Sequence, residues 1–186
     1  MYVIKINNIF KEIAVNKIFF TMLLFCCLQC SVLAKGVYQT SEQFIVHAFN
    51  GDMPSAKVLW LSKEDKLLIA EIMQHKFNRL RLRYWLKNSE TVWVLEEIGK
   101  EKPITVGVHI SKNMIAELKV LAFRESRGDE VRHEFFTSQF RAASIDKKNK
   151  LSQHIDGITG ATMSVRALTK VARLALWLHK KVLKSS

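Results

Sequence analysis

The sequence has few of the residues that break regular structure, and few cysteines. Its 186 residues include only 2 prolines and 7 glycines, which excludes collagen-like and low-complexity chains. The three cysteines, Cys26, Cys27 and Cys30, all lie in one apolar run near the start. This placement excludes a disulfide framework and a cysteine-rich zinc site from the rest of the chain. A content of 48% hydrophobic and 25% charged residues suits one folded domain.

The first 34 residues have the pattern of an export signal. Lys5 and Lys11 precede an uncharged run over residues 18–34, which ends in the small residues Val32 and Ala34. We expect cleavage after Ala34, one domain over residues 35–186 and a periplasmic location. The alternative is a retained inner-membrane anchor, although a helix over this run spans only ~26 Å of a ~30 Å hydrocarbon core.

Positive charge dominates the chain. The formal net charge is +12, and removing residues 1–34 with their three lysines and one glutamate leaves +10. Such a protein is attracted to anionic membrane surfaces and to acidic partner proteins. Nucleic acid is the usual alternative for this charge, but an exported protein rarely meets it, so we expect no nucleic-acid partner.

The middle of the chain predicts two helices and then an antiparallel sheet. A short helix capped by Ser41 has one apolar side, and a capping box at Ser62–Asp65 begins a second helix whose stripe comprises Leu67, Leu68, Ile72 and Met73. From Arg79 the pattern has period two, with arginines on the outer face. Three more strands follow over residues 91–98, 104–110 and 114–123, joined by turns too short for parallel crossovers.

The end of the chain predicts aromatic anchors and a long amphipathic helix. Phe135, Phe136 and Phe140 follow a charged loop over residues 124–128. A helix over residues 163–183 carries the apolar stripe Val165, Leu168, Val171, Ala172, Ala175, Leu176 and Leu183. The expected fold is therefore α+β, an antiparallel meander flanked by helices.

Chemistry is concentrated in the loop before this helix, Asp156-Gly157-Ile158-Thr159-Gly160-Ala161-Thr162. Its glycines permit unusual backbone conformations, and the N–H groups of a helix start favour a phosphate. A hydroxyl here suits either binding an anion or covalent attachment to it. On spacing alone, an ordinary helix N-cap by Thr159, Thr162 or Ser164 is an equally good interpretation.

This loop resembles the flavinylation motif of the FMN-binding domain family. The family pattern is Asp, two variable positions, Ser or Thr, Gly, Ala, then Thr or Ser, and Asp156, Thr159, Gly160, Ala161 and Thr162 match it throughout. Gly157 is also common there. The family includes the flavin-carrying small subunits of sodium-translocating NADH:quinone oxidoreductase and of ferredoxin-linked ion pumps. It also includes stand-alone exported flavin carriers, which this chain is more similar to.

The resemblance implies a covalent cofactor. A separate magnesium-dependent flavin transferase would use FAD to join FMN to Thr162 through a phosphoester. The other motif residues and Ser164 would shape the loop and bind the cofactor or be read by the transferase. Weaker likeness extends over residues 98–174, where Glu125, Arg127 and Gly128 occupy a loop that lies near the flavin in relatives. Gln139-Phe140 resembles the family's Gln-Phe-x-Gly, with Ala142 in place of the glycine.

Three functions remain open on the sequence. The first is an exported electron carrier between redox partners such as cytochromes or a membrane oxidoreductase, with no catalytic residue of its own. The second is a noncatalytic protein that binds an anionic membrane or polymer through its basic strand and last helix, anchored by Trp177. The third is a flavin-dependent reductase with its own substrate. The six histidines lack metal-ligand spacing, so no metal site is predicted.

Overall fold

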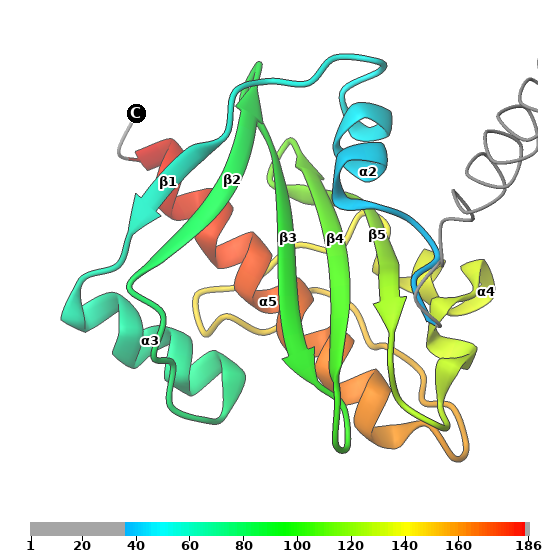
Figure 1. Ribbon diagram of the computed structural model, residues 1–186. Helices are drawn as coiled ribbons and strands as arrows, with labels where there is room; N and C mark the ends of the chain where they lie inside the picture. The colour runs from blue at the N-terminus through cyan, green and yellow to red at the C-terminus, as the bar shows by residue number, and fades with distance from the viewer. Residues whose placement is uncertain (1–35, 185–186) are drawn as a thin grey trace, which may run out of the picture. The chain divides into compact units, whose positions relative to one another are not determined.

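A five-stranded antiparallel sheet forms the centre of the fold. The computed structural model describes residues 36–184, and the expected export signal lies outside the described residues. The strand order β1-β2-β3-β4-β5 follows the sequence (Figure 1). The strands are β1 (Lys57–Trp60), β2 (Arg81–Lys87), β3 (Glu90–Ile98), β4 (Pro103–Ser111) and β5 (Met114–Phe123). The predicted α+β class with an antiparallel meander is confirmed.

Two tight turns explain why consecutive strands pair. Asn88 and Ser89 join β2 to β3 with φ values of 48° and 63°, and Lys112 and Asn113 join β4 to β5 with 51° and 61°. Two central residues with positive φ are typical of the type I′ turn, whose twist matches that of the strands it joins. The meander therefore follows from local chain geometry at both hairpins.

One strand of the sheet was not predicted, and another begins two residues later than predicted. β1 was not predicted, because only Leu59 of its four residues is even partly buried, so no alternation is visible. β2 begins at Arg81 instead of Arg79, and Leu80 is 63% exposed. The predicted basic outer face is confirmed within β2, where Arg81 and Arg83 are exposed and Leu82 and Tyr84 are buried.

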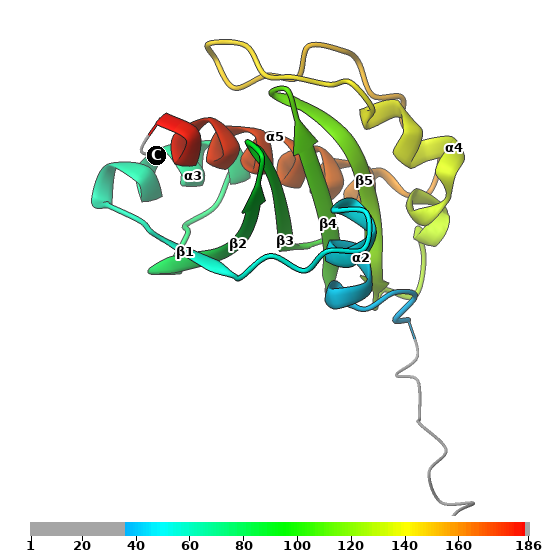
Figure 2. The ribbon, with the colours of Figure 1, turned by 90° about the horizontal axis from the view of Figure 1, so that it is seen from above.

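Helices cover both faces of the sheet. The long helix α5 (Thr162–Lys184) crosses one face and packs on β3, β4 and β5, with α3 (Lys63–Met73) beside it. The short helix α2 (Ser41–Ala48) packs on the opposite face, as Figure 2 shows. The main core lies between α5 and the sheet, and a smaller core gathers around Phe44 of α2 and Trp85 of β2.

The buried stripe of α5 is wider than the sequence suggested. The predicted positions from Leu168 to Leu176 are buried, but Val165 and Leu183 are only half-buried. Leu174, Leu178, His179 and Val182 are also buried. The stripe is wider because α5 contacts α3 as well as the sheet.

Side chains fix the starts of the two shorter helices. Thr40, not the predicted Ser41, is the N-cap of α2 and forms a capping box with Gln43. The predicted capping box of α3 between Ser62 and Asp65 is confirmed. The predicted stripe of α3 is partly wrong, because α3 buries Ile69, Ile72 and Met73 and leaves Leu67 and Leu68 66% and 40% exposed.

Short helical turns connect β5 to the loop before α5. They are η1 (Asp129–Arg132), α4 (Glu134–Thr137) and η2 (Ser138–Phe140). Phe136 and Phe140 are fully buried and meet edge to face, with ring centroids 5.7 Å apart, so these two predicted anchors are confirmed. Phe135 is 64% exposed, and its predicted anchoring role is wrong. Among residues 36–184, no helix is long and apolar enough to cross a membrane.

A buried histidine couples α5 to the sheet. His179 is fully buried, and its Nδ1 lies 2.8 Å from the hydroxyl of Thr91, which also accepts the indole N–H of Trp93 at 3.0 Å. Within the described residues, the other ring nitrogen of His179 has no hydrogen-bond partner. Burial therefore lowers the pKa of His179 to about 4.

We expect the fold to lose stability in mild acid because of His179. Between about pH 6.5 and pH 4 the unfolded chain binds a proton at this position and the folded chain does not, so the free energy of unfolding falls as the pH falls. The full difference is about 3 kcal/mol. Urea titrations at several pH values should show this slope in the wild type and a weaker slope in a His179→Leu variant. Parallel slopes would contradict the assignment.

Candidate functional site

Thr162 is the first residue of α5, and its side chain is exposed. The first intrahelical bond runs from the N–H of Val165 to the carbonyl of Ala161 at 3.0 Å, which makes Ala161 the N-cap. Alanine offers no side-chain acceptor, so this helix starts without the usual cap. The interpretation of Thr159, Thr162 or Ser164 as the N-cap is therefore wrong, and the Thr162 hydroxyl is available for another role.

The start of α5 is electrostatically suited to an anion. The N–H groups of Thr162, Met163 and Ser164 precede the first intrahelical bond, and no residue in the described part of the chain accepts from them. The first turn of α5 also contains no acidic side chain to offset the positive end of the helix dipole. A phosphate group at Thr162 would meet both features.

Gly128 packs closely against the start of α5. A Cβ atom at this position would lie 2.8 Å from the Ser164 hydroxyl and 3.4 Å from Ala161, and its φ of 85° favours glycine. The loop after β5 therefore packs tightly against the N-cap. Ser164, which the sequence grouped with the cofactor-binding residues, is 4% exposed and forms part of this contact.

A cleft of about 580 Å³ opens in front of Thr162. Two other segments face the helix start across it, the turn between β3 and β4 and the loop after β5. The lining residues are Lys100, Glu101, Glu125, Ser126, Arg127, Gly160, Ala161, Thr162, Met163 and Ser164. The structure thus brings five sequence-predicted residues, Glu125, Arg127, Gly160, Ala161 and Ser164, into one cleft with Thr162.

Glu125 ties two walls of the cleft together. Its Oε1 accepts the backbone N–H groups of Lys100, Glu101 and Lys102 at 2.6, 2.7 and 2.9 Å. Desolvation raises the pKa of Glu125, but these three donors outweigh it and hold the pKa below its ordinary value. The carboxylate is therefore a structural brace of the β3–β4 turn. The positive charges at the cleft are those of Lys100 and Arg127.

Three motif residues lie in the exposed loop before the cleft: Asp156, Gly157 and Thr159. The Asp156 carboxylate is 84% exposed and lies 3.6 Å from the ring of His154. Gln139 accepts the backbone N–H of Asp156 at 2.7 Å through Oε1, so it positions the loop without lining the cleft. The backbone carbonyl of Gln139 accepts a hydrogen bond from Gln153.

The backbone conformation of Ala142 explains why the family pattern Gln-Phe-x-Gly has a glycine at this position. Its φ is 61°, in the left-handed region where glycine is unstrained, and its N–H donates to the carbonyl of Ile115 at 2.8 Å. The glycine is therefore favoured at this position by backbone conformation. Alanine adopts the same turn here at a cost of about 1 kcal/mol.

The cleft also contains four residues that were not predicted as site residues: Lys100, Glu101, Ser126 and Met163. A signal for the first two existed, because Ile104 at the start of β4 pairs with Phe123 at the end of β5. This pairing places the β3–β4 turn beside the loop that follows β5. Within residues 36–184, no group of three or more His, Cys, Asp or Glu could hold a metal ion.

Comparison with known families identifies the domain. Residues 99–176 match the model of the FMN-binding domain family. The chain contains an FMN-binding domain. The matched segment runs from the β3–β4 turn into α5 and includes every residue that lines the cleft. The search of curated proteins and the search of solved structures found no match. The predicted resemblance to the FMN-binding domain family is confirmed for this segment, which makes the protein a flavin-binding protein with FMN as its cofactor.

The cleft of the FMN-binding domain fits the phosphate end of FMN. It offers the exposed Thr162 hydroxyl, three helix-start N–H groups and two cationic side chains, all of which complement a phosphate. Its volume lies within the range of about 300–1,000 Å³ that small-molecule sites occupy. When bound, FMN supplies the redox chemistry, and this chain supplies binding and orientation.

We expect the contact of Gly128 with the helix start to be essential to the site. A Gly128→Ala variant should lose at least about 1 kcal/mol of unfolding free energy, because the new methyl group meets Ser164 and the backbone is left-handed. Gly157→Ala is the matched control, since a Cβ there meets nothing within 4 Å and its φ is not positive. Urea denaturation should separate the two variants, and equal stabilities would contradict the role of Gly128.

Proposed function

We propose that this protein carries FMN in a covalent phosphoester with Thr162 and acts as an exported electron carrier. The observation that supports it best is the state of the Thr162 hydroxyl. It stands exposed at the first position of α5, is not used as a cap and faces a cleft with cationic walls. The family match covers this residue and its whole surroundings.

Attachment follows from the chemistry of a secondary alcohol. A threonine hydroxyl is a weak nucleophile at neutral pH, so a separate magnesium-dependent transferase must activate it. The Thr162 oxygen attacks the phosphorus on the FMN side of FAD, a new O–P bond forms, the pyrophosphate O–P bond breaks and AMP leaves. The hydroxyl proton passes to a base of the transferase. Asp156, Thr159 and Gly160 are exposed, as residues read by that enzyme need to be.

Residues of this chain would then hold the product. The phosphoester would remain against the helix-start N–H groups, and Lys100 and Arg127 would add charge complementarity at the cleft walls. Glu125 and Gly128 would keep the two loops in place. A covalent link suits a protein that works where free FMN is scarce, because the cofactor cannot diffuse away.

The partners we propose are acidic redox proteins, such as cytochromes or a membrane oxidoreductase, outside the cytoplasm. The net charge of +10 that remains without residues 1–34, and the exposed cations at the cleft, favour electrostatically guided docking of such proteins.

We expect covalent flavin on Thr162 and on no other residue. Co-expression of the full chain with a flavin transferase should give a polypeptide that stays fluorescent after acid denaturation, and intact-mass spectrometry should show one FMN adduct. Thr162→Ala should remove the adduct, whereas Thr162→Ser should keep it because a hydroxyl remains.

Thr159→Ala is the matched control for Thr162→Ala, because it also removes a threonine from the loop but leaves the acceptor hydroxyl in place. Thr159 is an exposed threonine three residues earlier in the same loop. Its replacement should affect only the yield of modification, because the acceptor oxygen is still present. A Thr162→Ala protein that retains the adduct, or a wild-type protein that never acquires it, would contradict the proposal.

A further inference from the structure

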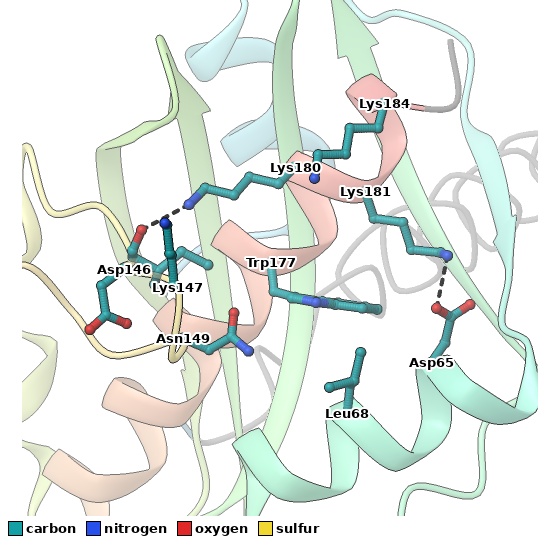
Figure 3. A pocket seen from close by; sticks show the side chains of 10 residues that line it. Asp65, Leu68, Asp146, Lys147, Asn149, Trp177, Lys180, Lys181 and Lys184 are labelled. Atoms are coloured by element: carbon teal, nitrogen blue, oxygen red, sulfur yellow. Dashed lines mark hydrogen bonds and ion pairs between the residues drawn. The ribbon is translucent and has the colours of Figure 1, made fainter.

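A second hollow lies at the other end of α5. It has a volume of about 860 Å³ and opens between α3, the loop over residues 145–149 and the last turns of α5 (Figure 3). None of its lining residues belongs to the cleft at Thr162. We name it the lysine–tryptophan pocket, after Trp177, Lys147, Lys180, Lys181 and Lys184.

Apolar groups form one part of this pocket. The Trp177 ring lies between Leu68 of α3 and Asn149 of the loop, as Figure 3 shows. Leu68 is 40% exposed, and its neighbour Leu67 is 66% exposed. Leu68 lines the pocket, whereas Leu67 lies beside it in the sequence and does not line it. Both leave apolar surface in water, which contact with an apolar layer would remove.

Four lysines surround these apolar groups. Lys180 donates to the carbonyl of Ile145 at 2.8 Å, and Lys181 pairs with Asp65 at 2.8 Å and lies over the Trp177 ring at 5.9 Å. The ammonium groups of Lys147 and Lys184 make no ion pair with any residue in the described range. The pocket also contains the carboxylates of Asp65 and Asp146, so four lysines against two carboxylates leave a formal charge of +2.

The helix dipole accounts for only part of this arrangement. Lysines in the last turn of α5 complement the negative end of the dipole, which explains Lys181 and Lys184. Lys147 comes from a separate loop, and the dipole explains neither this lysine nor the exposed leucines of α3. The two unexplained features are both satisfied by a ligand that is anionic at its surface and apolar beneath.

We propose that the lysine–tryptophan pocket and Leu67–Leu68 form a docking face for an anionic phospholipid bilayer. The leucines and the Trp177 ring would enter the interface, and the lysine ammonium groups would bind the headgroup phosphates. An anionic bilayer places phosphate groups directly above an apolar layer, which matches lysines beside leucines. The combination of both features on one face favours the bilayer.

This face lies far from the cleft at Thr162. Thr162 and Lys184 are the two ends of α5, and a helix of its 23 residues places them about 33 Å apart. The docking face therefore shares no residue with the attachment site and does not need the flavin.

Hydrogen exchange on the full chain tests the docking face directly, because it is read segment by segment. Vesicles of phosphatidylglycerol should slow amide hydrogen exchange in α3 and in the last two turns of α5. Addition of 0.5 M salt, which shortens the Debye length to about 4 Å, should remove this effect. Vesicles of phosphatidylcholine should have little effect. Binding through another part of the chain does not produce this pattern.

A charge-matched pair of variants sharpens the test. Lys147→Gln/Lys184→Gln should raise the phosphatidylglycerol concentration for half-maximal protection about 30-fold, by the usual contribution of a lysine near an anionic surface. Arg81→Gln/Arg83→Gln removes the same charge from the exposed face of β2 and should leave this concentration unchanged. Both variants can be made without and with the Thr162 adduct.

Several results would overturn the proposal. They are no protection with phosphatidylglycerol, equal protection with phosphatidylcholine, or a loss of protection in the Arg81/Arg83 variant instead. Protection of the same segments by soluble polyglutamate but not by vesicles would assign the face to an acidic protein and also overturn it. A protein that shows the expected pattern but never acquires the adduct on co-expression with the transferase would keep the docking face while refuting the proposed attachment.

Discussion

The absence of a side-chain cap at the start of α5 is the feature on which the site depends. Ala161 provides the cap position without an acceptor, so three backbone N–H groups and the positive end of the dipole remain available beside the exposed Thr162 hydroxyl. A Ser or Asp at position 161 would satisfy one of these donors and place a competing oxygen beside Thr162. Attachment chemistry and helix capping thus exclude each other at this helix start.

Packing on the sheet fixes the position of the start of α5. α5 buries eleven residues between its first and last turns, so its direction is fixed along its whole length. The antiparallel pairing of β3, β4 and β5 brings the β3–β4 turn and the end of β5 to the same edge. Glu125 then joins these two segments, and Gly128 presses the second of them against Ala161. A rigid frame with exposed ligand groups results.

Local signals made much of this fold predictable. The strands from β2 to β5, the capping box at Ser62 and the stripe of α5 all follow from periodicity and cap chemistry, and the motif located Thr162. The failures share a cause, because they depend on what lies opposite a residue in space. Phe135 and Leu67 have the right residue type for a core, but they are 64% and 66% exposed. β1 is an edge strand without alternation. Lys100 lies in the cleft because the register of β3, β4 and β5 places its turn there. An alanine side chain gives no sign of the left-handed backbone conformation at Ala142.

The proposed attachment site lies at the start of α5, and the lysine–tryptophan pocket lies at its end. The proposed function depends on the attachment site. Three hydroxyls lie within six residues there, on Thr159, Thr162 and Ser164. Fragmentation of the modified peptide by tandem mass spectrometry distinguishes them, because each backbone break shows which side retains the flavin phosphate. The account predicts that the added mass is on Thr162. Finding it on Thr159 or Ser164 would contradict the central claim.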